Sequence, residues 1–215
     1  MDKILGLAFV IIGYFFGCIQ SGYIYGRLHG IDIREHGSKN SGATNSLRTM
    51  GKKAGIIVLT MDFLKAILPC LCVRLLYLGT GYELILMLYM GIGVVLGHDF
   101  PFYLGFRGGK GVASTGAVML VLDFRVAFFC LIMFIIIVAI TKYVSVGSIS
   151  VMILFFIILT YMSRMEYMPI NTLYVTEFNI LCFFITGFTI FMHRANIKRL
   201  IAGNENKIGV GKLEK

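Results

Sequence analysis

A basic, glycine-rich segment lies between two apolar stretches and carries the residue types that bind phosphate. Four of the seven residues from 105 to 111 are glycines. Glycine lets the backbone approach an anion closely, and the apolar run that starts at Val112 predicts a helix whose first N–H groups point toward the same place. We therefore predict a phosphate site whose charges and backbone donors come from Arg107, Gly108, Gly109, Lys110 and Gly111.

This segment differs from a nucleotide-binding P-loop. A P-loop has Gly six residues before its Lys and Ser or Thr directly after it. Here Leu104 and Gly111 occupy those two positions relative to Lys110. The pattern therefore predicts phosphate binding and disfavours ATP hydrolysis.

A second polar segment, residues 37–48, follows the first apolar run. It consists mainly of small residues, hydroxyls, amides and an arginine. Such a loop can surround a polar ligand with side-chain donors and acceptors, although an ordinary flexible connector is the alternative. The candidate ligand-binding residues of this loop are Ser38, Asn40, Asn45 and Arg48.

Two further groups lie at predicted helix ends. Three basic residues follow His193 within six positions, which favours anion binding over a solvated helix cap. Ser145 and Ser148 are three residues apart and share one helix face. These serines either face a ligand or bond to the backbone of their own helix.

Composition places the chain in a membrane. Of its 215 residues, 58% are hydrophobic and 14% are charged, and the mean hydropathy is +0.84. We therefore predict an all-α, polytopic integral membrane protein with a single transmembrane domain over residues 1–215. The first apolar run, residues 4–25, is expected to be a retained span and not a signal peptide. The net charge of +9 is concentrated in particular loops, which argues against a nucleic-acid partner.

The remaining polar and small residues of the apolar segments are expected to be structural. All five cysteines lie in such segments without His or Asp at ligand spacing, so we expect neither a metal site nor a cofactor. Asp62 and Lys65 are spaced to form an ion pair on one helix. Glycine pairs four residues apart predict close helix packing at Gly13/Gly17, Gly22/Gly26 and Gly93/Gly97.

Hydropathy predicts about seven spans. They cover residues 4–25, 54–78, 84–96, 112–122, 126–140, 144–162 and 178–192. The segment 112–122 would be only about 16 Å long as a helix, about half of a hydrocarbon core. We expect a half-span or a hairpin at residues 123–125, and a version with five full spans plus short segments stays open. A single helix from 112 to 140 is disfavoured because it would place Asp123 and Arg125 in lipid.

The distribution of Lys and Arg predicts the orientation. Seven spans place residues 27–53, 98–111, 142–143 and 193–215 on one side, where they carry fifteen basic residues. The other side carries four, at Lys3, Arg74, Arg125 and Arg164. By the positive-inside rule, the N-terminus is expected outside and the C-terminus in the cytoplasm.

Three of these segments together resemble the motifs of one enzyme family. Residues 38–48, 97–112 and 193–200 are similar, in order and spacing, to the motifs of the bacterial acyl-phosphate:glycerol-3-phosphate acyltransferases, the PlsY family. The resemblance covers essentially the whole chain. Two departures are that Lys39 stands where the family usually has Gly, and Arg107 where Lys is common.

The resemblance implies a seven-helix enzyme of the bacterial inner membrane with its active site facing the cytoplasm. It implies transfer of a fatty acyl group from acyl phosphate to the sn-1 hydroxyl of glycerol 3-phosphate. The products are lysophosphatidic acid and phosphate, in the first step of phospholipid biosynthesis. The implied partners are the two substrates, the bilayer and a soluble enzyme that makes acyl phosphate. By motif position, the family's functional residues fall on Ser38, Asn40, Arg48, Lys110, Ser148, His193 and Asn196.

The implied chemistry agrees with the residues. An acyl phosphate is already activated, so the enzyme needs donors that position two phosphates and no nucleophile of its own. We expect direct transfer without an acyl-enzyme, with the phosphate of the donor as general base. Competing interpretations are a transporter or flippase for a phosphorylated solute and a membrane phosphatase. Transport is disfavoured because the basic groups lie at one surface and not near the bilayer midplane.

Overall fold

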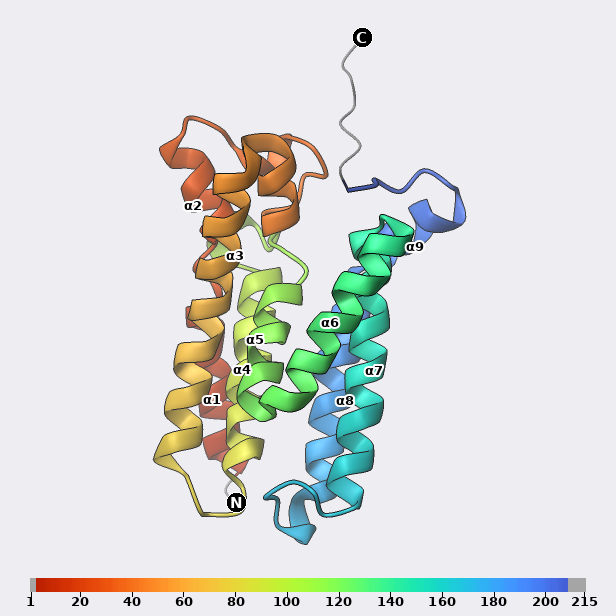
Figure 1. Cartoon of the computed structure of the whole chain (residues 1–215). Coiled ribbons are helices and arrows are strands. Elements are labelled where there is room, and N and C mark those ends of the chain that lie inside the picture. Colours follow the sequence, from red (N-terminus) through yellow and green to blue (C-terminus); the bar gives the residue numbers. More distant parts are fainter. Residues whose placement is uncertain (1–2, 209–215) are drawn as a thin grey trace.

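The computed structural model describes residues 3–208, and this part of the chain is all-helical (Figure 1). Six helical segments within it are long and apolar enough to cross a membrane, and a seventh apolar helix is shorter. The predicted all-α, polytopic membrane fold is therefore confirmed. The elements in chain order are α1 (Lys3–Gly17), α2 (Ser21–Leu28), η1 (Ile33–Glu35), α3 (Ala43–Leu76), α4 (Glu83–Asp99), η2 (Phe102–Leu104), α5 (Val112–Leu122), α6 (Phe124–Thr141), α7 (Val144–Arg164), η3 (Thr172–Tyr174), α8 (Val175–Met192) and α9 (Arg194–Ile201).

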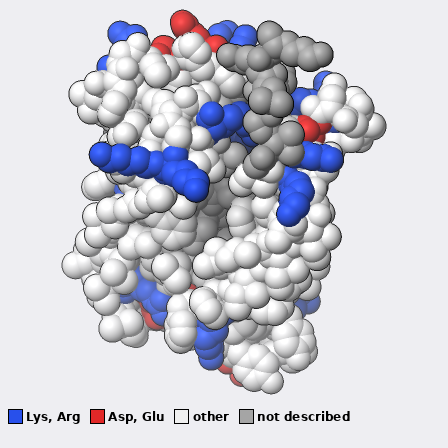
Figure 2. Space-filling model, turned by 45° about the horizontal axis from the view of Figure 1, so that its top comes forward, with Lys and Arg blue, Asp and Glu red and all other residues white. Residues whose placement is uncertain are grey.

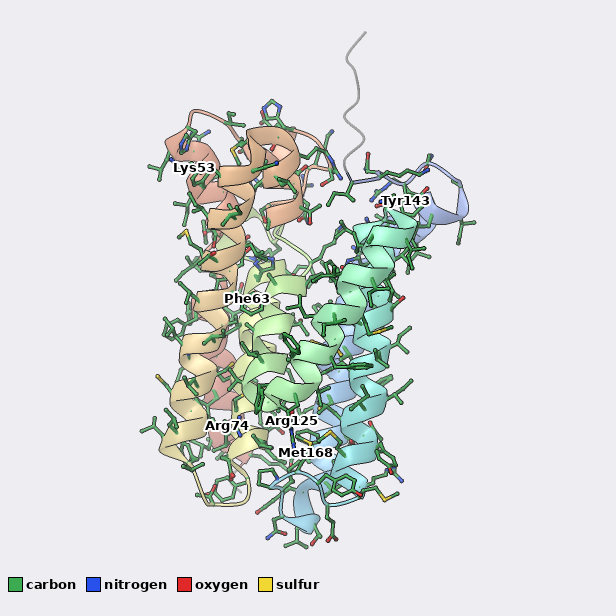
Figure 3. The ribbon with its side chains drawn as sticks, in the orientation of Figure 1. Lys53, Phe63, Arg74, Arg125, Tyr143 and Met168 are labelled. Atoms are coloured by element: carbon green, nitrogen blue, oxygen red, sulfur yellow. The ribbon has the colours of Figure 1, made fainter. Side chains whose placement is uncertain are left out.

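The polar segments predicted to share one side do lie at one end of the bundle. Figure 1 shows α2, the start of α3, the loop before α5 and α9 at the top, and the turns after α3 and α7 at the bottom. Figure 3 places Lys53 and Tyr143 toward the top and Arg74, Arg125 and Met168 toward the bottom. The chain therefore passes back and forth with the spacing that hydropathy predicts.

Helix α4 forms the centre of the bundle, and most of its residues are buried. Helix α1 packs along it through glycines: a Cβ added to Gly13 or Gly17 would come within 3.0 Å of a backbone oxygen of α4. The same holds for Gly93 and Gly97 against the carbonyls of α1. The close packing predicted from these glycine pairs is confirmed, because any side chain would force the two helices apart.

A break at residues 18–20 separates α1 from α2 inside one apolar span. The carbonyls released there accept hydrogen bonds from distant side chains. The Tyr103 hydroxyl donates to the Cys18 carbonyl at 2.7 Å, and Lys65 Nζ donates to the Ile19 carbonyl at 2.7 Å. Since unpaired carbonyls are costly in lipid, the break and these two side chains stabilise one another.

The short helix α5 and helix α6 form the expected hairpin. Asp123 ends α5 and caps α6, because its carboxylate accepts from the backbone N–H groups of Arg125 at 2.9 Å and Val126 at 3.2 Å. Arg74 of α3 donates to the Val121 carbonyl and so satisfies the C-terminus of α5. A single helix from 112 to 140 is therefore excluded, and α5 presents its N-terminus to the polar end of the bundle.

The backbone conformation at position 39 favours glycine. Lys39 has φ of 58°, in the left-handed region that favours glycine. Its side chain is exposed and does not line the cavity described below. We expect Lys39→Gly to raise the free energy of unfolding by about 1 kcal/mol because it removes this backbone strain. Thermal unfolding in detergent measures the effect.

Lys39→Ala is the matched control for that substitution. It removes the same charge but keeps a Cβ, so it should leave the unfolding temperature almost unchanged. Equal stabilisation by Ala and Gly would instead assign the effect to the charge.

Candidate active site

A cavity of 680 Å³ lies between α3, α5, α6, α7 and the C-terminal segment. It opens at the end of the bundle where the polar segments gather. Eight of the residues predicted from the sequence line it, although they come from separate segments: Ser38, Asn40, Asn45, Arg48, Lys110, Ser148, His193 and Asn196. The fold therefore assembles most of the predicted site in one place.

The rest of the cavity wall is apolar. Its lining continues along α5 and α6 through Gly116, Leu120, Phe128, Leu131 and Phe134. The side of this groove is open to the outer surface of the bundle, since Phe128 is 62% exposed and Leu120 is 40% exposed. Figure 2 shows Lys and Arg around the upper part of a hollow in this face and uncharged residues along its sides. The cavity thus joins a cationic head to an apolar groove.

A chain of hydrogen bonds fixes the cationic head. Lys110 Nζ donates to Asn196 Oδ1 at 2.6 Å, and Asn196 Nδ2 donates to Glu205 Oε1 at 2.7 Å. The other carboxylate oxygen of Glu205 pairs with Arg199 Nε at 2.7 Å. The Ser145 hydroxyl donates to Glu205 Oε1 at 3.3 Å. Glu205 therefore orients the amide and guanidinium groups around the cavity.

Glu205 and Arg199 were not predicted from the sequence to belong to the site. Both line the cavity. A signal was present, because Glu205 is an acidic residue in a strongly basic C-terminal segment. A carboxylate accepts strong, charge-assisted hydrogen bonds from basic side chains near it.

Lys110 lies close to other cations. Burial and, to a smaller extent, the nearby charges of Arg199 and Arg48 lower the pKa of its ammonium to about 8, although Glu205 opposes them. Positive charges that converge on one partly buried point repel each other until an anion arrives. The head of the cavity is therefore suited to an anionic ligand.

His193 is held in one tautomer. Its Nδ1 lies 2.8 Å from the Thr189 carbonyl, which can only accept, so Nδ1 carries the hydrogen. Burial lowers the pKa of His193 to about 4, which makes the ring neutral at pH 7 with a lone pair on Nε2. For His193 to donate to phosphate, as predicted from the sequence, it must take up a proton as the anion binds. A nearby anion raises the pKa of an imidazole and favours that uptake.

Two of the glycines predicted to donate to phosphate use their N–H groups within the protein. The N–H of Gly108 donates to the Asp99 carbonyl at 3.0 Å, and the N–H of Gly109 donates to the His98 carbonyl at 2.9 Å. Neither N–H is free for a phosphate, and Gly108, Gly109 and Gly111 do not line the cavity. These glycines instead allow the loop to fold tightly against the end of α4, since a Cβ on any of the three would come within 3.0 Å of a neighbouring atom.

Two further residues predicted for the site, Arg107 and Asn45, differ in their surroundings. Arg107 is exposed and lies outside the cavity lining. The buried amide of Asn45 is fully used inside its own loop: Oδ1 accepts from the Ser38 N–H at 2.8 Å, and Nδ2 donates to the carbonyls of Ile33, His36 and Asn40. Asn45 therefore holds the backbone of Ser38 and Asn40 in place, and it also lines the cavity.

Ser148 is one of two serines of α7 that line the cavity, and its hydroxyl is partly engaged. The Ser148 hydroxyl donates to the Val144 carbonyl at 2.9 Å, so only its lone pairs face a ligand.

Arg48 lines the cavity at the start of α3, just before Gly51 bends that helix with φ of 85°. The bend brings this first turn of α3 and its guanidinium over the cavity and away from the axis of the span.

Comparison with known proteins assigns this architecture. Residues 7–203 match the model of a family described as glycerol-3-phosphate acyltransferase. The chain belongs to this family. A glycerol-3-phosphate acyltransferase of Clostridioides difficile (strain 630) is 40% identical over 203 residues, which are 93% of each chain. One from Thermoanaerobacter sp. (strain X514) is 37% identical over 202 residues, again 93% of each chain.

Solved structures agree with the sequence relatives. A crystal structure of PlsY, an integral membrane glycerol 3-phosphate acyltransferase, in its glycerol 3-phosphate form has a TM-score of 0.82 and 35% identity, covering 95% of this chain and 96% of that one. The lysophosphatidic acid form has a TM-score of 0.80 and 33% identity, covering 95% of both chains. Three predictions are therefore confirmed. The chain belongs to the PlsY family, it is an acyltransferase, and it is a multi-pass membrane protein.

Proposed function

We propose that this acyltransferase moves a fatty acyl group from acyl phosphate to the sn-1 hydroxyl of glycerol 3-phosphate. The products are 1-acyl-glycerol 3-phosphate and inorganic phosphate, in the first step of phospholipid biosynthesis. The observation that carries the proposal is the continuity of a cationic head with an apolar groove open to the side. Such a cavity suits a phosphate attached to a long chain, and two phosphate groups can share the cations of its head.

The proposed step needs no protein nucleophile. The sn-1 hydroxyl oxygen attacks the carbonyl carbon of acyl phosphate, an ester bond forms, and the bond from that carbon to the phosphate oxygen breaks. The hydroxyl proton passes to the phosphate of the donor, whose second pKa of about 6 leaves an oxygen free at neutral pH. The phosphates are held in position by Arg48, Lys110 and Asn196. The polar end of the substrate is bound by Ser38 and Asn40.

The arrangement of nucleophiles supports direct transfer. The hydroxyl of Ser148 already donates to a backbone carbonyl. Four of the five cysteines are buried, and Cys72 is exposed on the apolar surface of α3. The reaction therefore proceeds in a ternary complex, with glycerol 3-phosphate and acyl phosphate bound together.

Purified protein in detergent should form lysophosphatidate from palmitoyl phosphate and glycerol 3-phosphate in the presence of a chelator, without ATP or coenzyme A. Release of phosphate should require glycerol 3-phosphate, and mass spectrometry should identify the lipid product. Palmitoyl-CoA in place of palmitoyl phosphate is the control and should give no product. Activity with palmitoyl-CoA while palmitoyl phosphate is inert would refute the proposed donor. A stoichiometric acyl adduct on the intact protein that glycerol 3-phosphate then discharges would refute direct transfer.

We further propose that the cavity faces the cytoplasm of a bacterial inner membrane, because the loops around it carry most of the Lys and Arg. In a Cys-free variant, single cysteines at the exposed positions of Arg107 and Asn204 should resist an impermeant thiol reagent in intact cells. Cysteines at the exposed positions of Arg164 and Tyr167, at the other end, should react. The reverse pattern would invert the proposed orientation.

A further inference from the structure

A buried polar network lies directly beneath the glycine loop and outside the cationic head. It joins the break after α1 to α3 and α4. Lys65 Nζ contacts Asp62 Oδ1 at 2.9 Å, the Ile19 carbonyl at 2.7 Å and His98 Nδ1 at 2.8 Å. The Ser21 hydroxyl donates to the same oxygen of Asp62 at 2.8 Å. The ion pair expected from the sequence is thus part of a larger assembly.

The contacts of Lys65 determine the tautomer of His98. An ammonium has N–H donors and no acceptor, and Lys65 Nζ lies 2.8 Å from His98 Nδ1. His98 Nδ1 must therefore accept, and the hydrogen of the neutral ring is on Nε2. This tautomer is the opposite of that of His193, whose Nδ1 donates to a carbonyl.

The other edge of the His98 ring lies against the glycine loop. A Cβ on Gly109 would come within 3.0 Å of Nε2, so glycine is needed for the ring to sit there. Gln20 Nε2 donates to the His98 carbonyl at 2.9 Å and fixes the backbone beneath the ring. His98 is only 3% exposed, and it lines the cavity. Within residues 3–208, Nε2 has no hydrogen-bond partner.

A cavity-lining N–H group that has no protein acceptor is available to a ligand that supplies one. The ligand of this cavity carries phosphate oxygens, and the Gly109 backbone that touches the ring leads directly to Lys110. Resting on the proposed function, we propose that His98 is a substrate-binding residue whose Nε2–H donates to a phosphate oxygen. Lys65 and Asp62 are its positioning residues, because they hold the ring in the donating tautomer.

The direct test is nitrogen NMR of the protein labelled with ¹⁵N-histidine in detergent micelles. The chain has four histidines, and single substitutions assign their signals. In the free protein, we expect the hydrogen on Nε2 of His98 and on Nδ1 of His193. Saturating inorganic phosphate should shift the Nε2–H signal of His98 downfield. The exposed His29 and His36 provide reference signals that should not move.

Separate additions distinguish the source of the phosphate. We compare the effect of glycerol 3-phosphate alone with that of a non-hydrolysable acyl phosphonate alone. The compound whose phosphate or phosphonate group contacts His98 should reproduce the shift. A hydrogen on Nδ1 of His98, or an Nε2–H signal that none of the three anions moves, would overturn the proposal. The NMR measurement needs no turnover. Its result therefore remains valid even if the enzyme uses an acyl donor other than acyl phosphate.

Kinetics provide the second readout. His98→Leu removes the donor and should lower kcat/KM for the contacted substrate by about 10-fold to 100-fold. His98→Gln keeps an amide donor and should recover part of that loss, while His36→Leu should have no effect. Thermal unfolding identifies any variant that fails to fold. A folded His98→Leu with unchanged kcat/KM for both substrates would also overturn the proposal.

Discussion

Lys110→Ala should lower kcat/KM for glycerol 3-phosphate by at least about 100-fold, which corresponds to roughly 2.7 kcal/mol of lost transition-state stabilisation. The substitution removes a cation from the head of the cavity and breaks its hydrogen bond to Asn196. Steady-state kinetics with palmitoyl phosphate measures the effect. Lys53→Ala is the matched control, because Lys53 is exposed at the same end of the bundle and does not line the cavity.

The pH dependence of the same parameter tests the role of the ammonium. Burial lowers the pKa of Lys110 to about 8, so the free protein loses this charge as the pH rises through about 8, earlier than an exposed lysine would. Since kcat/KM reports ionisations of the free enzyme, it should fall above pH 8. The fall should be absent in Lys110→Ala. Near-normal activity of Lys110→Ala would show that the cation does not bind phosphate.

Gly109→Ala should also lower activity by about 100-fold, because a displacement of catalytic groups of about 1 Å can have that effect. The added Cβ would come within 3.0 Å of the His98 ring, which Lys65 holds from its other side. The loop must therefore move, and Lys110 moves with it. Kinetics of the purified variant and its unfolding temperature measure the two consequences.

Gly187→Ala is the control for an added methyl group. Gly187 is in α8, and a Cβ there has no atom within 4 Å. Alanine is also the better helix former, so stability should be equal or slightly higher and activity unchanged. Normal activity of Gly109→Ala would mean that the loop tolerates displacement and does not position Lys110.

Local properties of the sequence determined the course of the chain. Hydropathy located the spans, and the charges at residues 123 and 125 indicated the turn between α5 and α6, because a charged residue has a high free-energy cost in lipid wherever the chain goes. The polar loops could be assigned to one end for the same reason. Eight of the predicted site residues therefore reached the cavity, including Arg48, Lys110 and His193.

Tertiary structure decided which donors are free. Gly108 and Gly109 were expected to offer N–H groups, but the end of α4 supplies carbonyls that use them. Asn45 was expected to bind a ligand, but three carbonyls of its own loop accept from its amide. Arg107 and Lys110 are three positions apart, yet only Lys110 enters the cavity. Glu205 acquires its role through contacts with Asn196 and Ser145. A hydrogen bond depends on distance and direction between groups far apart in the chain, and residue type and spacing do not determine those.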